Sequence, residues 1–273
     1  MNIVLAGNKN FIKQLNVVIC SCDKFNKDCN YYVLSNDLNK EDFLITKKLE
    51  IIRISDNLIK DVKIPKQYII DYSIASFYRV LIYKLLYFDK CIYLDGDTLV
   101  CDNISSIYNI NDNILFNGVI ELIRPIQLTY GPLFSYMKTI EEFNCFYKKC
   151  TYFNDGVLTM NLKLMNDINY IDSIINLSKK YQTQTFIQDF ENIIALKYGV
   201  NFMDYSFNIM PFDFYQNIDF NNLKNSIYTK DVILNSINNP KIIHFAGKPK
   251  PWETNLNVLF YNKWREFCNE IYV

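Results

Sequence analysis

Two aspartates separated by a single glycine, Asp95-Gly96-Asp97, come directly after the apolar run CIYL at residues 91–94. Side chains at positions i and i+2 of an extended segment point to the same side, so the two carboxylates are expected to lie next to each other. Neighbouring carboxylates repel each other when both are ionised, unless a cation neutralises them. The spacing therefore predicts a cation site at the end of a buried strand.

The single histidine of the chain, His244, offers a third ligand for such a cation. It follows two isoleucines and precedes FAGKPKPW at residues 245–252. The glycine in this segment permits close approach of the backbone to a phosphate group, and the lysines would neutralise phosphate oxygens. Two carboxylates and one imidazole, with phosphate oxygens at the remaining positions, suit Mn²⁺ or Mg²⁺, and the imidazole favours Mn²⁺.

Each of these signals has an alternative explanation. An isolated Asp-x-Asp is about as often a polar turn that closes a strand, and a lone histidine after an apolar strand is more often structural than a ligand. A phosphatase of the haloacid dehalogenase type also has an aspartate after an apolar strand. That pattern has one more residue before its threonine, whereas Thr98 follows Asp97 directly. An EF-hand is disfavoured because the downstream acidic ligands are absent.

Strands and helices are expected to alternate along the chain, which indicates an α/β fold with a parallel sheet. In such sheets, ligands bind beyond the carboxyl ends of the strands. Three polar clusters fall at such ends, and we expect them to converge: residues 7–10, 95–97 and 244–250. The expected strands are 3–6, 31–34, 49–54, 91–94, 115–120, 157–161 and 242–245. The expected helices are 11–22, 40–47, 73–88, 186–196 and 258–271.

Composition narrows the class of protein. The chain has 273 residues, of which 50% are hydrophobic, and its formal net charge is zero, so it lacks the basic excess of a nucleic-acid binder. Its eight cysteines are scattered, which predicts reduced thiols in a cytoplasmic protein. No signal peptide or transmembrane helix is expected, so any membrane association would be loose and peripheral at the inner face. No linker or repeat divides the chain, and one domain covering residues 1–273 is expected.

Seven motifs occur in order from residue 2 to about residue 265: NIVLAGNKNF, SIASFYRVLIYKLL, YLDGDTLV, YFNDGVLTMNLKLM, FIQDFENII, FNIMP and IIHFAGKPKPW. Together they resemble glycosyltransferase family 8, the group that contains bacterial lipopolysaccharide galactosyl- and glucosyltransferases and glycogenin. The resemblance implies a single-domain GT-A fold, a Rossmann-like mixed sheet flanked by helices. It also implies transfer of a hexose from a UDP-sugar, with retention at the anomeric carbon. The acceptor would be a saccharide, a lipid-linked saccharide or a glycoprotein, in cell-surface glycan or lipopolysaccharide synthesis.

The resemblance also implies a role for individual residues. The metal would be held by Asp95, Asp97 and His244. Catalytic roles would fall to Asp189, Asn154 and Lys250. The donor would be bound by Leu5, Ala6, Asn8, Asn10, Arg79, Gly96, Asn154, Asp155, Gly156, Gln188, Asp189, Gly247, Lys248 and Lys250.

Several of these residues have simpler interpretations. Asn154-Asp155-Gly156 is a good turn sequence, and Asp189 can be an exposed helix charge. Arg79 can pair with an acid on an amphipathic helix, and Lys248 can be a solvated loop charge.

Two residues depart from the family pattern. Asn8 stands where relatives commonly have an acid, and Phe190 stands where they often have a glutamine, which would leave an apolar face beneath the transferred sugar. With no carboxylate placed as a covalent nucleophile, front-face attack is favoured, in which the leaving phosphate accepts the proton of the acceptor. Three hypotheses follow: a glycosyltransferase, a catalytically weak nucleotide-sugar-binding protein, and a metal-dependent phosphohydrolase.

Overall fold

The computed structural model describes residues 1–64, 66, 69, 73–122, 151–181, 185–215 and 227–273. The β-strands in these segments are β1 (Asn2–Ala6), β2 (Asn30–Ser35), β3 (Leu49–Arg53), β4 (Lys90–Leu94), β5 (Thr98–Val100), β6 (Phe116–Ile120), β7 (Phe153–Asn161), β8 (Val200–Phe202) and β9 (Ile242–His244). The α-helices are α1 (Ile12–Phe25), α3 (Ile82–Leu85), α7 (Leu162–Asp167), α8 (Tyr170–Lys180), α9 (Ile187–Tyr198), α10 (Pro211–Tyr215), α11 (Lys230–Asn238) and α12 (Tyr261–Ile271). The 3₁₀ helices are η1 (Lys9–Phe11), η2 (Lys40–Asp42), η3 (Asp56–Leu58), η4 (Ile74–Leu81), η5 (Ser105–Tyr108) and η6 (Tyr205–Phe207).

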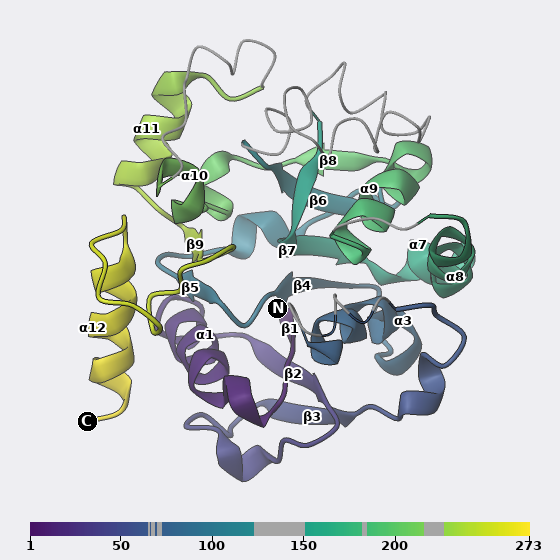
Figure 1. Cartoon of the computed structure of the whole chain (residues 1–273), viewed down its shortest axis with the longest axis horizontal. Helices are drawn as coiled ribbons and strands as arrows, with labels where there is room; N and C mark the ends of the chain where they lie inside the picture. The colour runs from purple at the N-terminus through teal and green to yellow at the C-terminus, as the bar shows by residue number, and fades with distance from the viewer. Residues whose placement is uncertain (65, 67–68, 70–72, 123–150, 182–184, 216–226) are drawn as a thin grey trace.

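Seven strands form the central sheet, in the order β3-β2-β1-β4-β7-β6-β8 (Figure 1). The strands β1 to β4 pair in parallel, as the alternation of strands and helices predicts. Strand β7 is antiparallel to both β4 and β6, so the sheet is mixed, as the family resemblance implies. A second, two-stranded sheet pairs β5 with β9 in antiparallel fashion.

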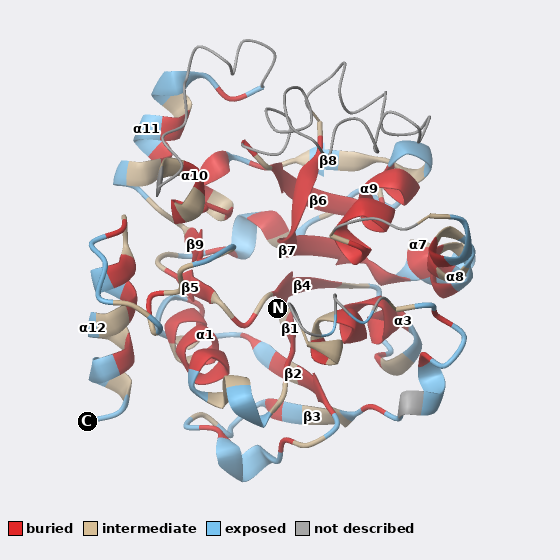
Figure 2. Cartoon of the chain, in the orientation of Figure 1, coloured by how far each residue is buried: buried red, intermediate tan, exposed pale blue. Residues whose placement is uncertain are grey.

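Helices cover both faces of the central sheet. In Figure 1, α1 lies on one side of the strands, with α12 beyond it, and α3, α7 and α8 lie on the other. Residues of one strand alternate between the two cores that result: Val4 of β1 and Tyr93 of β4 belong to one, and Ile3, Leu5 and Ile92 to the other. Because these strands are buried on both faces (Figure 2), they form continuous apolar runs such as CIYL.

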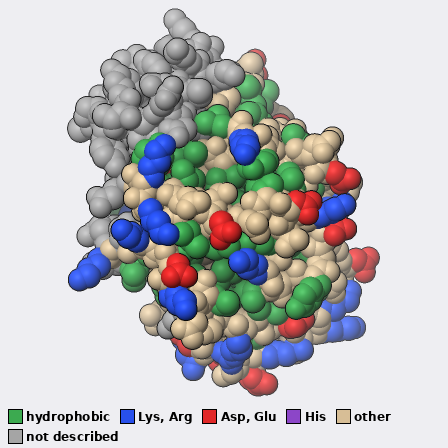
Figure 3. All heavy atoms as spheres, turned by 90° about the vertical axis from the view of Figure 1, so that its right-hand side faces the viewer, with side chains coloured by type: hydrophobic (Ala, Val, Ile, Leu, Met, Phe, Trp, Pro, Cys, Tyr) green, Lys and Arg blue, Asp and Glu red, His purple; other side chains and the backbone are tan. Residues whose placement is uncertain are grey.

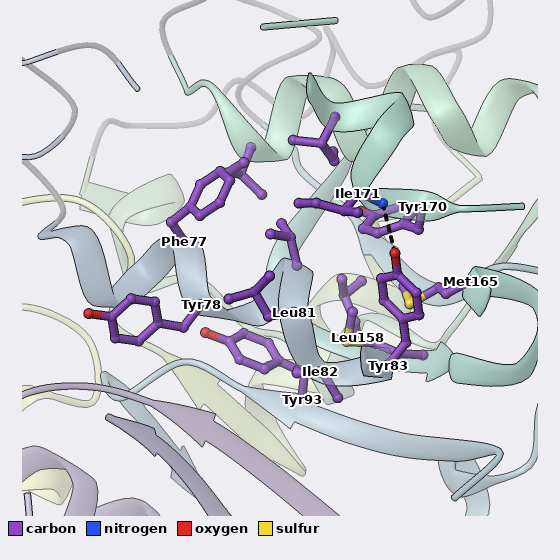
Figure 4. Close-up of a cluster of buried hydrophobic side chains, with 14 of the residues drawn as sticks. Phe77, Tyr78, Leu81, Ile82, Tyr83, Tyr93, Leu158, Met165, Tyr170 and Ile171 are labelled. Carbon is purple, nitrogen blue, oxygen red and sulfur yellow. Dashed lines mark hydrogen bonds between the residues drawn. The ribbon is translucent and has the colours of Figure 1, made fainter. Parts of the chain in front are cut away.

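The core between η4, α3 and α8 is rich in aromatic side chains (Figure 4). Two of its tyrosine hydroxyls are hydrogen-bonded: Tyr83 accepts from the backbone N–H of Ile171 at 3.2 Å, and Tyr170 donates to the Glu191 carboxylate at 3.0 Å. On the molecular face that Figure 3 shows, charged side chains of both signs are scattered among apolar ones, in keeping with the zero net charge.

Three of the expected segments have a different structure, and several elements, among them β5, β8, α8 and α11, were not expected from the sequence. Residues 40–47 contain only the short η2, because the Asp42 carboxylate accepts from the backbone N–H of Asn39 at 2.7 Å and the next residue, Phe43, is extended and buried. Residues 73–88 form a 3₁₀ helix followed by α3 in place of one long helix. Strand β7 begins at Phe153, so the sequence Asn154-Asp155-Gly156 is buried strand and not a turn.

Two further properties concern thiols and membranes. The six cysteines in the described segments are free. Among the helices of those segments, none has the length and apolar character that crossing a bilayer requires.

Candidate active site

A cavity of about 500 Å³ opens beyond the carboxyl ends of β1 and β4. The three polar clusters expected to converge all contribute to its wall. These contributors are Gly7, Asn8 and Asn10 after β1, Asp95, Gly96 and Asp97 after β4, and His244, Ala246, Gly247 and Lys250 at and after β9. The sequence therefore located this edge of the sheet correctly, although β9 belongs to the smaller sheet.

The candidate metal ligands lie together at one wall of this cavity. Ligand atoms of Asp95, Asp97 and His244 all lie within 4.8 Å of one another. His244 Nε2 is 3.2 Å from Asp97 Oδ1 and 3.8 Å from Asp95 Oδ2. The pairing of β5 with β9 holds this geometry, because Thr98 is directly opposite His244 and the N–H of Phe245 donates to the carbonyl of Asp97 at 2.9 Å.

Asn208 determines which nitrogen of His244 faces the carboxylates. The Asn208 Oδ1 lies 3.1 Å from His244 Nδ1, and the Asn208 Nδ2 donates to Asn154 Oδ1 at 3.0 Å. With Nδ2 committed to donation, Oδ1 can only accept, so Nδ1 of the imidazole carries the proton. In the neutral imidazole this leaves the Nε2 lone pair directed at Asp95 and Asp97, as a metal ligand requires. The donor set and the tautomer both fit a divalent cation.

Opposing charges shift the pKa values of this group. Burial alone would raise the pKa of Asp97, but the ammonium of Lys250 and the imidazole of His244 hold it well below its usual range. Burial would lower the pKa of His244, and the nearby carboxylates of Asp97 and Asp95 outweigh it, so that its pKa is raised. In the absence of metal, His244 therefore keeps its proton to a higher pH than an isolated histidine.

Arg79 neutralises the carboxylates on the neighbouring wall. Its buried guanidinium bonds the Asp155 carboxylate at 3.0 Å and the Asp155 carbonyl at 2.8 Å, and it lies 3.5 Å from Asp95 Oδ1. The same Asp95 oxygen accepts from the Tyr93 hydroxyl at 2.8 Å. Burial still raises the pKa of Asp155 to about 6, although Arg79 opposes that shift. The charge of Arg79 within its apolar helix thus has a purpose at the site, and the arginine also lines the cavity.

Gly156 provides the space for the imidazole. A Cβ at this position would lie 2.1 Å from His244 Cε1 and 2.8 Å from Asp95 Oδ2. Its carbonyl accepts from the N–H of Asp95 at 2.8 Å, so β7 and the aspartate loop are joined at this point. Any side chain here would displace two of the three candidate ligands.

The helix α9 turns Gln188 toward the cavity and Asp189 away from it. Gln188 lines the cavity, whereas Asp189 is fully buried and bonds the Tyr152 hydroxyl at 2.6 Å and the N–H of Thr185 at 3.0 Å. Phe190 is buried as well and packs on Phe186 with ring centroids 5.0 Å apart. Asp189 and Phe190 do not line the cavity in this arrangement, and their predicted places beside the sugar stay predictions. Adjacent helical residues point about 100° apart, so only one of them can face the cavity.

Of the remaining predicted residues, some line the cavity and others lie outside it. Lys250 Nζ lines the cavity and donates to Asp97 Oδ2 and to the Phe245 carbonyl, each at 2.6 Å. Lys248 is exposed and does not contribute to the wall. Leu5 is buried in β1 beneath the cavity, while the next residue, Ala6, is part of the wall.

Comparison with known proteins identifies the family. Residues 2–256 match the sequence profile of Glycosyl transferase family 8. The chain belongs to glycosyltransferase family 8. Its fold is GT-A: it is similar to the galactosyltransferase LgtC in complex with donor and acceptor sugar analogues, with a TM-score of 0.76 and 20% identity over 99% of this chain and 96% of that one.

Proteins similar to this family 8 chain occur in bacteria. The Streptococcus pneumoniae serotype 4 glycosyltransferase GlyF is 23% identical over 93% of this chain and 57% of its own length. A putative glycosyltransferase of Haemophilus influenzae is 28% identical over 92% of this chain and 73% of its own length. The chain thus spans little more than half of GlyF, and likewise 60% of the pneumococcal GlyB.

Sequence reasoning missed several residues of this family 8 site. Three of them hydrogen-bond to predicted site residues: Asn208 to His244, Tyr93 to Asp95, and Tyr152 to Gln188. Glu121 and Asp213 line the same cavity. Asn208 and Tyr152 lie within two of the motifs that carry the resemblance, FNIMP and YFNDG, which was the available signal for them.

The raised pKa of His244 predicts the pH dependence of metal binding. A metal must displace the imidazole proton, so Mn²⁺ affinity should fall as pH drops, by up to about tenfold per unit. Because the pKa is raised, affinity should still be climbing above pH 6.5, the ordinary histidine value, and level off once the imidazole is neutral. The charge on His244 has the opposite effect on the metal-free fold, which it stabilises at low pH and ceases to stabilise as pH rises through the raised pKa.

Calorimetry of Mn²⁺ binding from pH 6 upward, in two buffers of different ionisation enthalpy, measures both the affinity and the proton released. Affinity that does not vary with pH, with no proton release, would remove His244 from the ligand set.

Proposed function

We propose that the protein is a retaining, metal-dependent hexosyltransferase that moves galactose or glucose from a UDP-sugar to a saccharide acceptor in cell-surface glycan or lipopolysaccharide synthesis. The observation that carries the proposal is the group formed by Asp95, Asp97 and His244 at the wall of a cavity of about 500 Å³, in a chain of glycosyltransferase family 8. Lipid-linked saccharides and glycoproteins are the other acceptors considered. Residues 1–273 would act as one catalytic domain in the cytoplasm, in keeping with the six free thiols.

The size and lining of the cavity support a nucleotide-sugar donor. Its volume of about 500 Å³ falls in the range of small-molecule sites. Ala6 and Asn10 at the end of β1 would border the nucleoside, and Gly247 and Lys250 would contact the diphosphate. Gly247 has a φ of 76°, which brings its backbone to the cavity in a conformation that other residues adopt only with strain.

Asp95, Asp97 and His244 would hold the metal, Mn²⁺ by the preference of imidazole and Mg²⁺ as the alternative. Bound there, the metal would act as a Lewis acid and neutralise the leaving diphosphate. Lys250 would add a second positive charge on the same side, since its ammonium already lies 2.6 Å from Asp97.

The side chains at the end of the cavity where the sugar would lie favour front-face attack. Asn154 and Gln188 present amides, and the Asp155 carboxylate is held by Arg79 at 3.0 Å. An amide orients hydroxyls without forming a stable glycosyl ester. We therefore propose that the acceptor hydroxyl attacks C1 from the side of the departing diphosphate, and that a phosphate oxygen takes its proton.

The test incubates the full chain with Mn²⁺ and a panel of nucleotide sugars, with and without saccharide acceptors, and measures nucleotide diphosphate release. NMR of the product's anomeric proton then reports its configuration, expected to be α from an α-linked donor. Binding without turnover would point to a nucleotide-sugar-binding protein, and phosphate release from simple monoesters to a phosphohydrolase. A β-linked product would overturn the retaining assignment.

The two lysines of the GKPKP segment provide a matched pair of variants. Lys250→Ala should lower kcat at least about tenfold and raise the donor dissociation constant less, because charge on the leaving group grows during the reaction. Lys248→Ala should change neither by more than about twofold, since Lys248 is exposed and outside the cavity wall. Steady-state kinetics with donor titration measure both. The reverse ranking of the two lysines would contradict the assignment.

A further inference from the structure

We infer that Tyr152 and Asp189 are positioning residues that hold the Gln188 side-chain amide in one orientation at the sugar end of the cavity. The inference rests on the proposed function, because it assigns a purpose to the amide that lines the cavity. It gives Asp189 a role that does not require contact with the sugar.

The first step is the direction of the bond between Tyr152 and Asp189. Both residues are fully buried, and the Tyr152 hydroxyl lies 2.6 Å from Asp189 Oδ1. An ionised carboxylate only accepts, so the single phenolic proton is committed to Asp189. The phenolic oxygen is then left to accept bonds, and it lies 3.2 Å from Gln188 Nε2 and 3.1 Å from Thr185 Oγ1.

The second step is the orientation of the Gln188 amide. Its Nε2 donates to the Tyr152 oxygen and to Glu121 Oε2, each at 3.2 Å. Its Oε1 accepts from Asn154 Nδ2 at 3.1 Å and from the backbone N–H of Asp155 at 3.2 Å. The swapped amide would set oxygen against two acceptors and nitrogen against two donors. Four hydrogen bonds therefore select one orientation of a side chain whose last torsion is otherwise soft.

The third step is what holds Asp189 itself. Its second oxygen accepts from the N–H of Thr185 at 3.0 Å, just before the N-terminus of α9, where backbone N–H groups lack partners within the helix. The intervening Phe186 has φ 47° and ψ −87°, a strained conformation for a residue with a side chain. The fold thus keeps a strained turn at the point where Thr185 and Asp189 meet Tyr152.

Removing the Tyr152 hydroxyl should therefore act through Gln188. Tyr152→Phe leaves the amide nitrogen with one acceptor fewer in a buried setting, so the amide gains alternative orientations. We expect kcat to fall about tenfold or more, while the dissociation constant of UDP stays within about twofold, because UDP lacks the sugar. In a Gln188→Ala background, the same change should lower kcat by less than about twofold.

Tyr83→Phe is the matched control. Tyr83 is also a buried tyrosine, and its hydroxyl accepts a hydrogen bond from the backbone N–H of Ile171 (Figure 4). Tyr83 does not line the cavity. Its loss should lower the melting temperature and leave kcat unchanged. Equal losses of kcat from Tyr152→Phe in the wild-type and Gln188→Ala backgrounds would overturn the inference, since additivity means that Tyr152 does not act through Gln188.

A second readout separates this inference from the proposed function. Should the wild-type protein turn over no nucleotide sugar, the proposed function fails, and NMR of the Gln188 side-chain NH₂ still decides the positioning role. Slow exchange with solvent in the wild type and faster exchange in Tyr152→Phe support it. Equal exchange rates in the two proteins overturn it.

Discussion

Replacing Asp97 by asparagine is expected to weaken Mn²⁺-dependent UDP binding by at least about 100-fold. The Asp97 carboxylate lies 3.2 Å from His244 Nε2 and 2.6 Å from Lys250 Nζ, so its charge serves the metal site and the phosphate-facing lysine together. Asparagine keeps the shape of the side chain and removes its charge. Loss of a residue that only hydrogen-bonds a metal ligand typically costs about 10- to 100-fold in metal affinity, and loss of a ligand is expected to cost at least as much. Calorimetric titration of UDP with and without Mn²⁺ measures the effect, and circular dichroism checks that the chain remains folded.

Asp102→Asn is the control for this experiment. Asp102 follows the other end of β5 and also pairs with a lysine, Lys241, but its side chain is half-exposed and does not line the cavity. It should leave Mn²⁺-dependent binding unchanged. The same metal dependence in Asp97→Asn as in the wild type would exclude Asp97 from the site.

A single methyl group added at Gly156 is also expected to weaken metal binding. The added Cβ would lie 2.1 Å from His244 Cε1, well inside van der Waals contact, and 2.8 Å from Asp95 Oδ2. His244 has no room to retreat by a small shift, because Asn208 holds its other face at 3.1 Å and its backbone is paired in β9. We expect Gly156→Ala to reduce Mn²⁺ affinity and transfer by at least about tenfold, measured by calorimetry and by UDP release.

Gly118→Ala separates this local effect from general destabilisation. Gly118 lies in the adjacent strand β6, where the atoms nearest to an added Cβ belong to the Phe153 and Leu158 side chains, at 3.1–3.3 Å. It should lower the melting temperature and spare Mn²⁺ binding. Loss of metal binding in proportion to lost stability in both variants would mean that Gly156 has no special part in the site.

The group of candidate ligands could be predicted from sequence because each member ends an apolar run. Asp95 and Asp97 follow β4, His244 completes β9, and polar residues at the ends of buried strands have few places to point. The sheet order did not follow from those runs alone. Strand β5 has three residues, too few to show a period, and it is β5 that joins the aspartates to the histidine.

The orientation of α9 was beyond sequence reasoning for a different reason. Gln188 and Asp189 are adjacent polar residues, and which of them faces the cavity depends on where the helix starts. That start is set by the positive φ of Phe186, which no pattern of residue types reveals for a phenylalanine. The buried strand at Asn154-Asp155-Gly156 is a comparable case: the local turn preference is overridden by pairing with β6 and by hydrogen bonds that the Gln188 side chain accepts from this segment.

The pairing of β5 with β9 also determines when the site can exist during synthesis. Lys250 lies 153 positions after Asp97 along the chain, and His244 is only slightly closer. The two aspartates therefore emerge from the ribosome long before the residues that neutralise them. Until β9 emerges and pairs with β5, a nascent chain presents two carboxylates without their imidazole and ammonium partners. The candidate metal site can therefore form only in a chain that has been made past His244, and metal binding can stabilise only such chains.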